Sequence, residues 1–139
     1  TTRDLRQFSA VLDVPVTMLV ANQPANNAET GYIVRRHARR PVSSGKAGLI
    51  EELLSPDLTD DFEVVHSTFE PHSKITKAVT RPTQELGYLV SGRMSIEIDG
   101  QVFDIRAGDS FRIRGEAFRW SNPHDDPAVA IWVIAPPVY

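Results

Sequence analysis

Hydrophobic residues from Gly31 onward fall in short runs separated by turn residues, a pattern typical of an all-β sandwich or barrel. In the clearest case, Met94, Ile96 and Ile98 alternate with polar residues, and Asp99-Gly100 then supplies a two-residue hairpin turn. The whole pattern predicts strands at residues 32–34, 49–54, 62–69, 87–90, 94–98, 102–105, 110–113, 118–121 and 129–134.

The last of these runs, residues 129–134, is apolar at every position, unlike the alternating runs before it. A strand with two apolar faces is expected to be buried on both sides. One side faces the interior of the barrel, and a second copy of the chain is the expected cover for the other. The sequence therefore predicts a homodimer.

The pattern is different at the start of the chain, where residues 1–20 predict two short helices. Leu5, Phe8 and Leu12 lie on one face of the first helix, which ends before Pro15. Two such helices cannot bury their apolar faces alone, so they must pack on the barrel, on a partner chain or on further helices.

A segment rich in Asn and Ala, residues 21–30, lacks periodicity and is predicted to be a linker to a main domain at residues 31–139. The length of 139 residues suits one main domain with a short appendage. With 41% hydrophobic and 24% charged residues, the chain has an ordinary globular composition.

Charge and cysteine content narrow the classes of function. The net charge of −3 argues against a chain that coats nucleic acid along its whole surface. The absence of cysteine excludes thiolate chemistry and disulfides, and no signal peptide or membrane-spanning run is visible. A cytoplasmic protein without membrane contact is expected.

Five segments stand out by their order and spacing: residues 85–92 (ELGYLVSG), Gly100, 107–111 (AGDSF), 120–122 (WSN) and 131–137 (IWVIAPP). Together they resemble the motifs of the cupin superfamily, whose fold is a jelly-roll barrel also described as a double-stranded β-helix. The resemblance covers residues 32–139 and is strongest to the C-terminal cupin domain of Xre-type helix-turn-helix transcriptional regulators.

Residues 1–20 resemble the last two helices of the lambda-repressor-like DNA-binding domain that precedes the cupin in such regulators. The resemblance implies that the helix-turn-helix itself lies upstream of Thr1, so DNA contact is expected through that part and not through this chain. A dense basic run at residues 35–40 (RRHARR) is expected to be a solvated strand, with DNA phosphates or a dimer partner as alternatives.

In metal-binding cupins, the first motif contains His-x-His, then Glu, then six residues and Gly. Gly92 follows Glu85 at that spacing, so the resemblance puts the two histidine positions at Val79 and Arg81 and the third, from the second motif, at Phe118. Val and Phe offer no donor atom and Arg stays protonated, which leaves Glu85 as the retained ligand. The resemblance therefore implies a barrel without metal or other cofactor.

A carboxylate inside a barrel needs a compensating cation, and Arg81 is expected to pair with Glu85 or to present its fork to a carboxylate or phosphate of a ligand. Apolar residues are expected to complete a small-molecule pocket. The alternative is a barrel filled by the aromatic side chains. The predicted ligand-binding residues are Arg81, Glu85, Val79, Leu89, Phe118 and Trp120.

These features predict a sensor domain that binds a small-molecule effector and is not an enzyme, coupled to DNA-binding helices in a dimeric regulator. One alternative is a metal-independent cupin enzyme of the isomerase or epimerase type, for which Tyr88 and His66 are the candidate acid and base. Another is a structural dimerisation module with a filled barrel.

Overall fold

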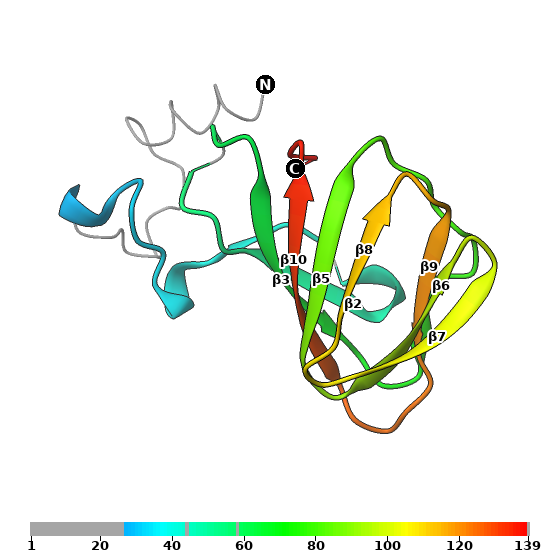
Figure 1. Ribbon diagram of the computed structural model, residues 1–139. Coiled ribbons are helices and arrows are strands. Elements are labelled where there is room, and N and C mark those ends of the chain that lie inside the picture. The colour runs from blue at the N-terminus through cyan, green and yellow to red at the C-terminus, as the bar shows by residue number, and fades with distance from the viewer. Residues whose placement is uncertain (1–26, 44, 58, 139) are drawn as a thin grey trace.

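Two antiparallel sheets face each other in a computed structural model that describes residues 27–43, 45–57 and 59–138 (Figure 1). The predicted helices of residues 1–20 lie outside the described residues. The six-stranded sheet has the order β1 (Arg40–Pro41), β2 (Leu49–Leu53), β3 (Glu63–Phe69), β10 (Ala128–Ala135), β5 (Gln84–Ser91) and β8 (Ser110–Arg114). The four-stranded sheet has the order β4 (Ser73–Lys74), β9 (Phe118–Asn122), β6 (Arg93–Ile98) and β7 (Gln101–Arg106).

This architecture confirms the all-β prediction for the described residues. The helices among them are single 3-10 turns, η1 (Asn27–Glu29), η2 (Arg36–Ala38) and η3 (Lys46–Gly48). None of these is long and apolar enough to cross a membrane.

The strand predicted at residues 32–34 is wrong. The amides of Tyr32 and Ile33 both donate hydrogen bonds to the carbonyl oxygen of Glu29, at 2.8 and 2.9 Å, and so close a turn after η1. Tyr32 is 81% exposed, so its ring does not pack in the core. Strand β5 begins at Gln84, earlier than predicted, because an inward-facing Glu85 interrupts the apolar pattern.

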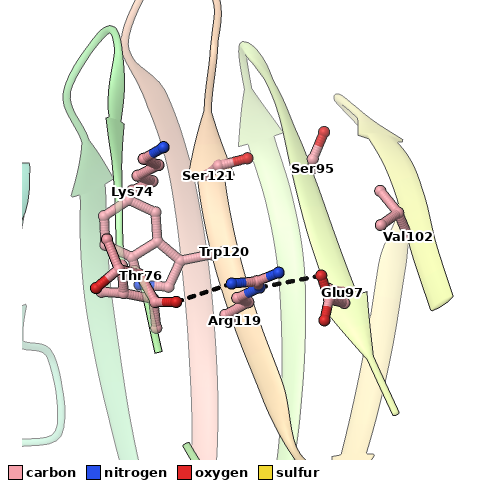
Figure 2. Close-up of a pocket in the computed structure, with 9 residues that line it drawn as sticks. Lys74, Thr76, Ser95, Glu97, Val102, Arg119, Trp120 and Ser121 are labelled. Carbon is pink, nitrogen blue, oxygen red and sulfur yellow. Dashed lines mark hydrogen bonds and ion pairs between the residues drawn. The ribbon is translucent and has the colours of Figure 1, made fainter. Parts of the chain in front are cut away.

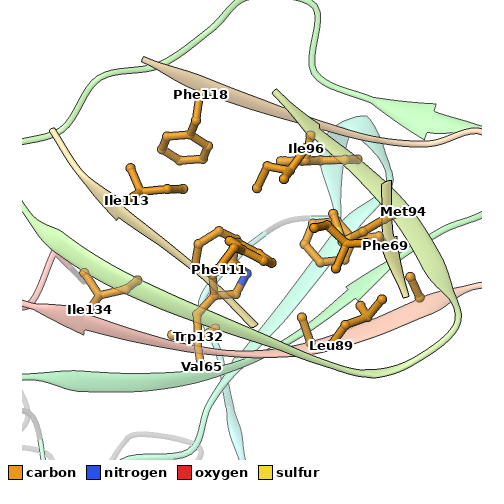
Figure 3. Close-up of a cluster of buried hydrophobic side chains, with 14 of the residues drawn as sticks. Val65, Phe69, Leu89, Met94, Ile96, Phe111, Ile113, Phe118, Trp132 and Ile134 are labelled. Atoms are coloured by element: carbon orange, nitrogen blue, oxygen red, sulfur yellow. The ribbon is translucent and has the colours of Figure 1, made fainter. Parts of the chain in front are cut away.

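The core fills the space between the two sheets with aliphatic and aromatic side chains (Figure 3). Most of the longer strands alternate buried residues with more exposed ones, as β5 and β3 show most regularly, whereas β7 is exposed at all but one position. The ring of Phe69 meets Trp120 edge-on at 4.8 Å between centroids, and Phe111 meets Trp132 in the same way at 5.2 Å. The first contact joins the two sheets, and the second packs strands β8 and β10 of the six-stranded sheet together.

Two glycines in left-handed conformations explain how the turns are made. Asp99 and Gly100, with φ of 51° and 84°, form the predicted hairpin turn between β6 and β7. Gly92, with φ of 83°, lies where the chain passes from β5 to β6. A Cβ on Gly92 would lie 2.5 Å from the carbonyl oxygen of Pro127, so a side chain is excluded there.

The outer face of the six-stranded sheet is apolar over β5 and β10. Leu86, Tyr88 and Val90 of β5 are 45–47% exposed, whereas the inward residues of the same strand are buried. The outward residues of β10 include Ile131, which pairs with Tyr88 on one side and His66 on the other. The prediction that a partner covers this face stays a prediction.

Candidate functional site

The residues that form the site come from the loop between β4 and β5 and from strands β2, β3, β9 and β10. Val79 pairs with Phe118 of β9 through two backbone hydrogen bonds of 2.8 and 2.9 Å. This bridge fixes the middle of the loop to the four-stranded sheet. Arg81 follows two residues later, and its guanidinium carbon lies 5.7 Å from the centre of the Phe118 ring.

A pocket of about 420 Å³ opens between the two sheets beneath this loop. Side chains leave this space open beneath the loop, while Phe69, Phe118, Trp120 and Trp132 are buried in the core behind it. Its walls are largely apolar, and Glu51, Thr80 and Arg81 supply the polar groups. The apolar and aromatic lining residues are Leu49, Phe69, Ile75, Val79, Phe118, Trp120, Trp132 and Ile134.

Arg81 and Glu85 form an ion pair at one end of this pocket. Nε of Arg81 lies 3.2 Å from Oε2 of Glu85, and Nη2 donates a hydrogen bond of 3.3 Å to Oε1. The hydroxyl of Thr83 donates a shorter bond of 2.6 Å to Oε2. The Glu85 side chain is fully buried while that of Arg81 is 33% exposed, so the guanidinium separates the carboxylate from the pocket and from solvent.

A second buried carboxylate, Glu51 of β2, lies further along the barrel. It accepts a hydrogen bond of 3.2 Å from the hydroxyl of Ser67, and it is 7% exposed. Glu63 of β3 and Glu85 of β5 both pair with Ile134 of β10, so the three residues form one rung across the sheet. Ser67, which pairs with Glu51 in another rung, is four residues from Glu63 along β3. At about 3.3 Å per residue, the Glu51 rung is ~13 Å from the Glu85 rung.

Five of the six predicted ligand-binding residues lie together. Val79, Arg81, Phe118 and Trp120 line the pocket, and Glu85 lies directly behind Arg81. Leu89 does not line the pocket: it is fully buried in the core.

Sequence reasoning missed eight residues of the site: Leu49, Glu51, Phe69, Ile75, Thr80, Thr83, Trp132 and Ile134. Glu51 lies in a segment that carries no motif, Trp132 lies in the 131–137 motif but has no ligand position there, and Phe69 ends a strand to which no site role was given. Thr83 was also missed, although its position two residues before a buried carboxylate is a recognisable signal.

The residues at the family's metal-ligand positions do not fit a metal. The structure brings Val79, Arg81, Glu85 and Phe118 together, as the resemblance implied. Glu85 is the one of the four with a donor suited to a divalent ion, and its oxygens already accept bonds from Thr83 and Arg81. Across the described residues, no cluster of three or more His, Asp or Glu side chains has metal-binding geometry.

The histidines that the structure describes do not approach the pocket, and none is among its lining residues. His66 faces outward from β3, where burial and then the charge of Arg39 lower its pKa below the ordinary value of 6.5. Tyr88 faces outward from β5 and is 46% exposed. The suggestion that Tyr88 and His66 act as acid and base inside the barrel is therefore wrong, because alternation puts both on the outer face.

A separate groove of about 340 Å³ crosses the outer face of the four-stranded sheet (Figure 2). Arg119 lies at its centre and is held at both ends. Its Nε donates to Glu97 at 3.0 Å and its Nη1 donates to the carbonyl oxygen of Thr76 at 2.8 Å. These bonds stabilise the contact between β9, β6 and the loop after β4, so the groove is explained by sheet structure.

The two-sheet barrel and its motifs have a counterpart among known families. The family described as "Cupin domain" matches residues 65–134, which is half of the chain. The chain belongs to the cupin family. No curated protein sequence is similar enough to the chain to count as a match.

Solved structures of diverse cupins share the fold. KdgF from Halomonas sp. is 19% identical, with a TM-score of 0.67 over 78% of this chain and 96% of that one. An RmlC-like cupin from Shewanella frigidimarina is 18% identical, with a TM-score of 0.65 over 76% and 91%. The cupin domain of an XRE family transcriptional regulator from Enterobacter cloacae is 19% identical, with a TM-score of 0.56 over 65% and 98%. At these identities, the likeness concerns the fold alone.

Proposed function

We propose that this cupin domain binds a small organic effector in its barrel, without a metal and without turning the effector over. The observation that carries the proposal is the open, largely apolar pocket of about 420 Å³ with an arginine where metal-binding cupins have a ligand. An aromatic wall supplies hydrophobic contact, and the Arg81 guanidinium supplies orientation.

The proposed context is an Xre-type regulator in which effector binding biases the DNA-binding helices. Two observations support it: the resemblance of residues 1–20 to the end of a lambda-repressor-like domain, and the fold shared with a cupin domain of an XRE family regulator. Coupling requires that the effector bind one conformation of the dimer better than another. DNA would be contacted by helices upstream of this chain.

Homodimerisation is part of the proposal. The outer face of the six-stranded sheet carries Leu86, Tyr88 and Val90, each nearly half exposed, beside the apolar strand β10. A two-fold axis through this face would bury these side chains against themselves. Replacing Leu86 with Lys is expected to give a monomer in analytical ultracentrifugation, while a monomeric wild-type chain would contradict this part.

The test of the pocket is a thermal-shift screen of a metabolite library on the metal-free chain, followed by mass spectrometry of each hit. The proposal expects a hit that raises the melting temperature in a concentration-dependent way and is recovered unchanged. Chemical conversion of the hit would favour the metal-independent enzyme. A library without any hit would favour a structural dimerisation module.

A further inference from the structure

The chemistry around Arg81 identifies the class of ligand that the pocket would take. This step rests on the proposed function. We propose that the effector is a monocarboxylate with an apolar or aromatic body, its carboxylate bound by the Arg81 guanidinium and its body held between the aromatic walls.

Arg81 has unused hydrogen-bonding capacity at the pocket. A guanidinium carries five N–H donors, and among the described residues it makes one hydrogen bond, from Nη2 to Glu85. Its Nε is buried, close to Glu85 but without hydrogen-bond geometry. Both contacts with Glu85, at 3.2 and 3.3 Å, exceed the 2.7–2.9 Å typical of charge-assisted bonds. The guanidinium is therefore available to a second anion.

The carboxylate of Glu85 is shared between Arg81 and a second donor. Thr83 donates the shortest bond in the cluster, at 2.6 Å, to Oε2 of Glu85. Arg81 lies over the ring of Phe118, which holds the guanidinium plane at the pocket wall. A carboxylate that arrives from the pocket side meets a positioned fork, with no need to displace the buried Glu85.

The pocket's charges favour a monoanion over a phosphate. Among the lining residues that the structure describes, Arg81 is the one cation, and Glu51 adds negative charge at the far end of the pocket. A phosphate monoester carries nearly two charges at neutral pH and would need further donors or cations. Glu51 repels any anion in the pocket, and it repels the nearly two charges of a phosphate monoester more strongly than the single charge of a carboxylate.

The remaining walls define the body of the ligand. Trp120, Trp132 and Phe69 back the pocket from the core, where each is at most 5% exposed, and Leu49, Ile75 and Val79 are aliphatic residues of its lining. The volume of about 420 Å³ is near the lower end of the range for ligand pockets, about 300–1,000 Å³. A short aliphatic or aromatic acid matches this space.

The experiment is isothermal titration of the full chain with 3-phenylpropanoate and hexanoate, each compared with its primary amide and with the amine of equal length. We expect the two acids to bind and the amides and amines to bind at least tenfold more weakly, because a hydrogen-bonded ion pair is lost. R81Q is expected to lower affinity for the acids by about tenfold or more.

R119Q is the matched control, since Arg119 is also ion-paired but lies outside the barrel. The affinity of the R119Q variant for the two acids should equal that of the wild type. R81K keeps the charge without the fork and should be intermediate, which provides a test if R81Q does not fold. Tighter binding of the amides or amines would overturn the carboxylate assignment while leaving a ligand pocket in place. Binding of acids that is unchanged in R81Q and R81K, or no binding of any probe, would also overturn it. The metabolite screen alone decides whether the pocket has a ligand of another class.

Discussion

The coupling between Arg81 and Glu85 can be measured as a contribution to stability. Removing one partner of a buried ion pair typically costs about 3–5 kcal/mol, because the other charge is left buried without compensation. Here the cost is smaller. The side chain of Arg81 is 33% exposed, its contacts are long, and Thr83 continues to bond Glu85 when the guanidinium is gone.

We therefore expect R81Q to lower the free energy of unfolding by about 2 kcal/mol. The reverse change, E85Q, should cost about 1 kcal/mol, because the guanidinium that remains is partly solvated. In the E85Q background, R81Q should cost less than about 0.5 kcal/mol, since no buried charge is left to compensate. The double-mutant cycle thus predicts a coupling of more than about 1 kcal/mol.

Urea unfolding followed by tryptophan fluorescence is the suitable assay. Both tryptophans of the chain, Trp120 and Trp132, are in the core, so their emission reports on loss of the barrel. R119Q serves again as control and should change stability by less than about 1 kcal/mol. Additive effects of R81Q and E85Q, or an R81Q variant as stable as the wild type, would refute the pairing.

Three further predictions concern the fold and its pH dependence. G92A should lower the free energy of unfolding by about 2 kcal/mol or more, because the backbone is strained at φ of 83° and the new Cβ would clash with a carbonyl oxygen 2.5 Å away. The control G100A places its Cβ in open space, with nothing within 4 Å, and should lower it by about 1 kcal/mol. Equal losses for the two variants would contradict the clash. G87A should strongly destabilise the fold or force Phe111 to move, since its Cβ would lie 2.4 Å from that ring, and a melting temperature equal to the wild type's would disprove the contact. The lowered pKa of His66 means that the unfolded chain binds its proton first, so stability should fall as the pH drops below 6.5. This slope should flatten in H66Q, and an unchanged slope would exclude His66 as its source.

Much of the barrel is predictable from local pattern because most of its longer strands alternate buried and more exposed residues. Residues 94–98 and the Asp99-Gly100 turn are confirmed with little change, since period-two burial and left-handed turn residues have local causes. The same reasoning fails at residues 32–34, where apolar side chains lie in a turn. Strands β1 and β4 are two residues long and exist through pairing with β2 and β9, which no local pattern reveals.

The site is less predictable because it joins residues that are distant in sequence. Family spacing was sufficient to group Val79, Arg81, Glu85 and Phe118, which the structure brings together. Glu51 belongs to no motif, and the 131–137 motif gives Trp132 no ligand position; their place in the pocket follows from strand register. Leu89 is predicted as an apolar residue of the pocket wall, but it is fully buried in the core and does not line the pocket.

The most direct test of the central claim, a barrel that holds an organic ligand at Arg81 in place of a metal, is metal content. The purified chain would be incubated with manganese, iron, nickel or zinc, desalted and analysed by plasma mass spectrometry. The triple variant V79H, R81H and F118H restores the family's donor set and serves as positive control. The account predicts far less than one equivalent of metal in the wild type and clear uptake in the triple variant. One equivalent bound by the wild type and lost in E85Q would contradict it.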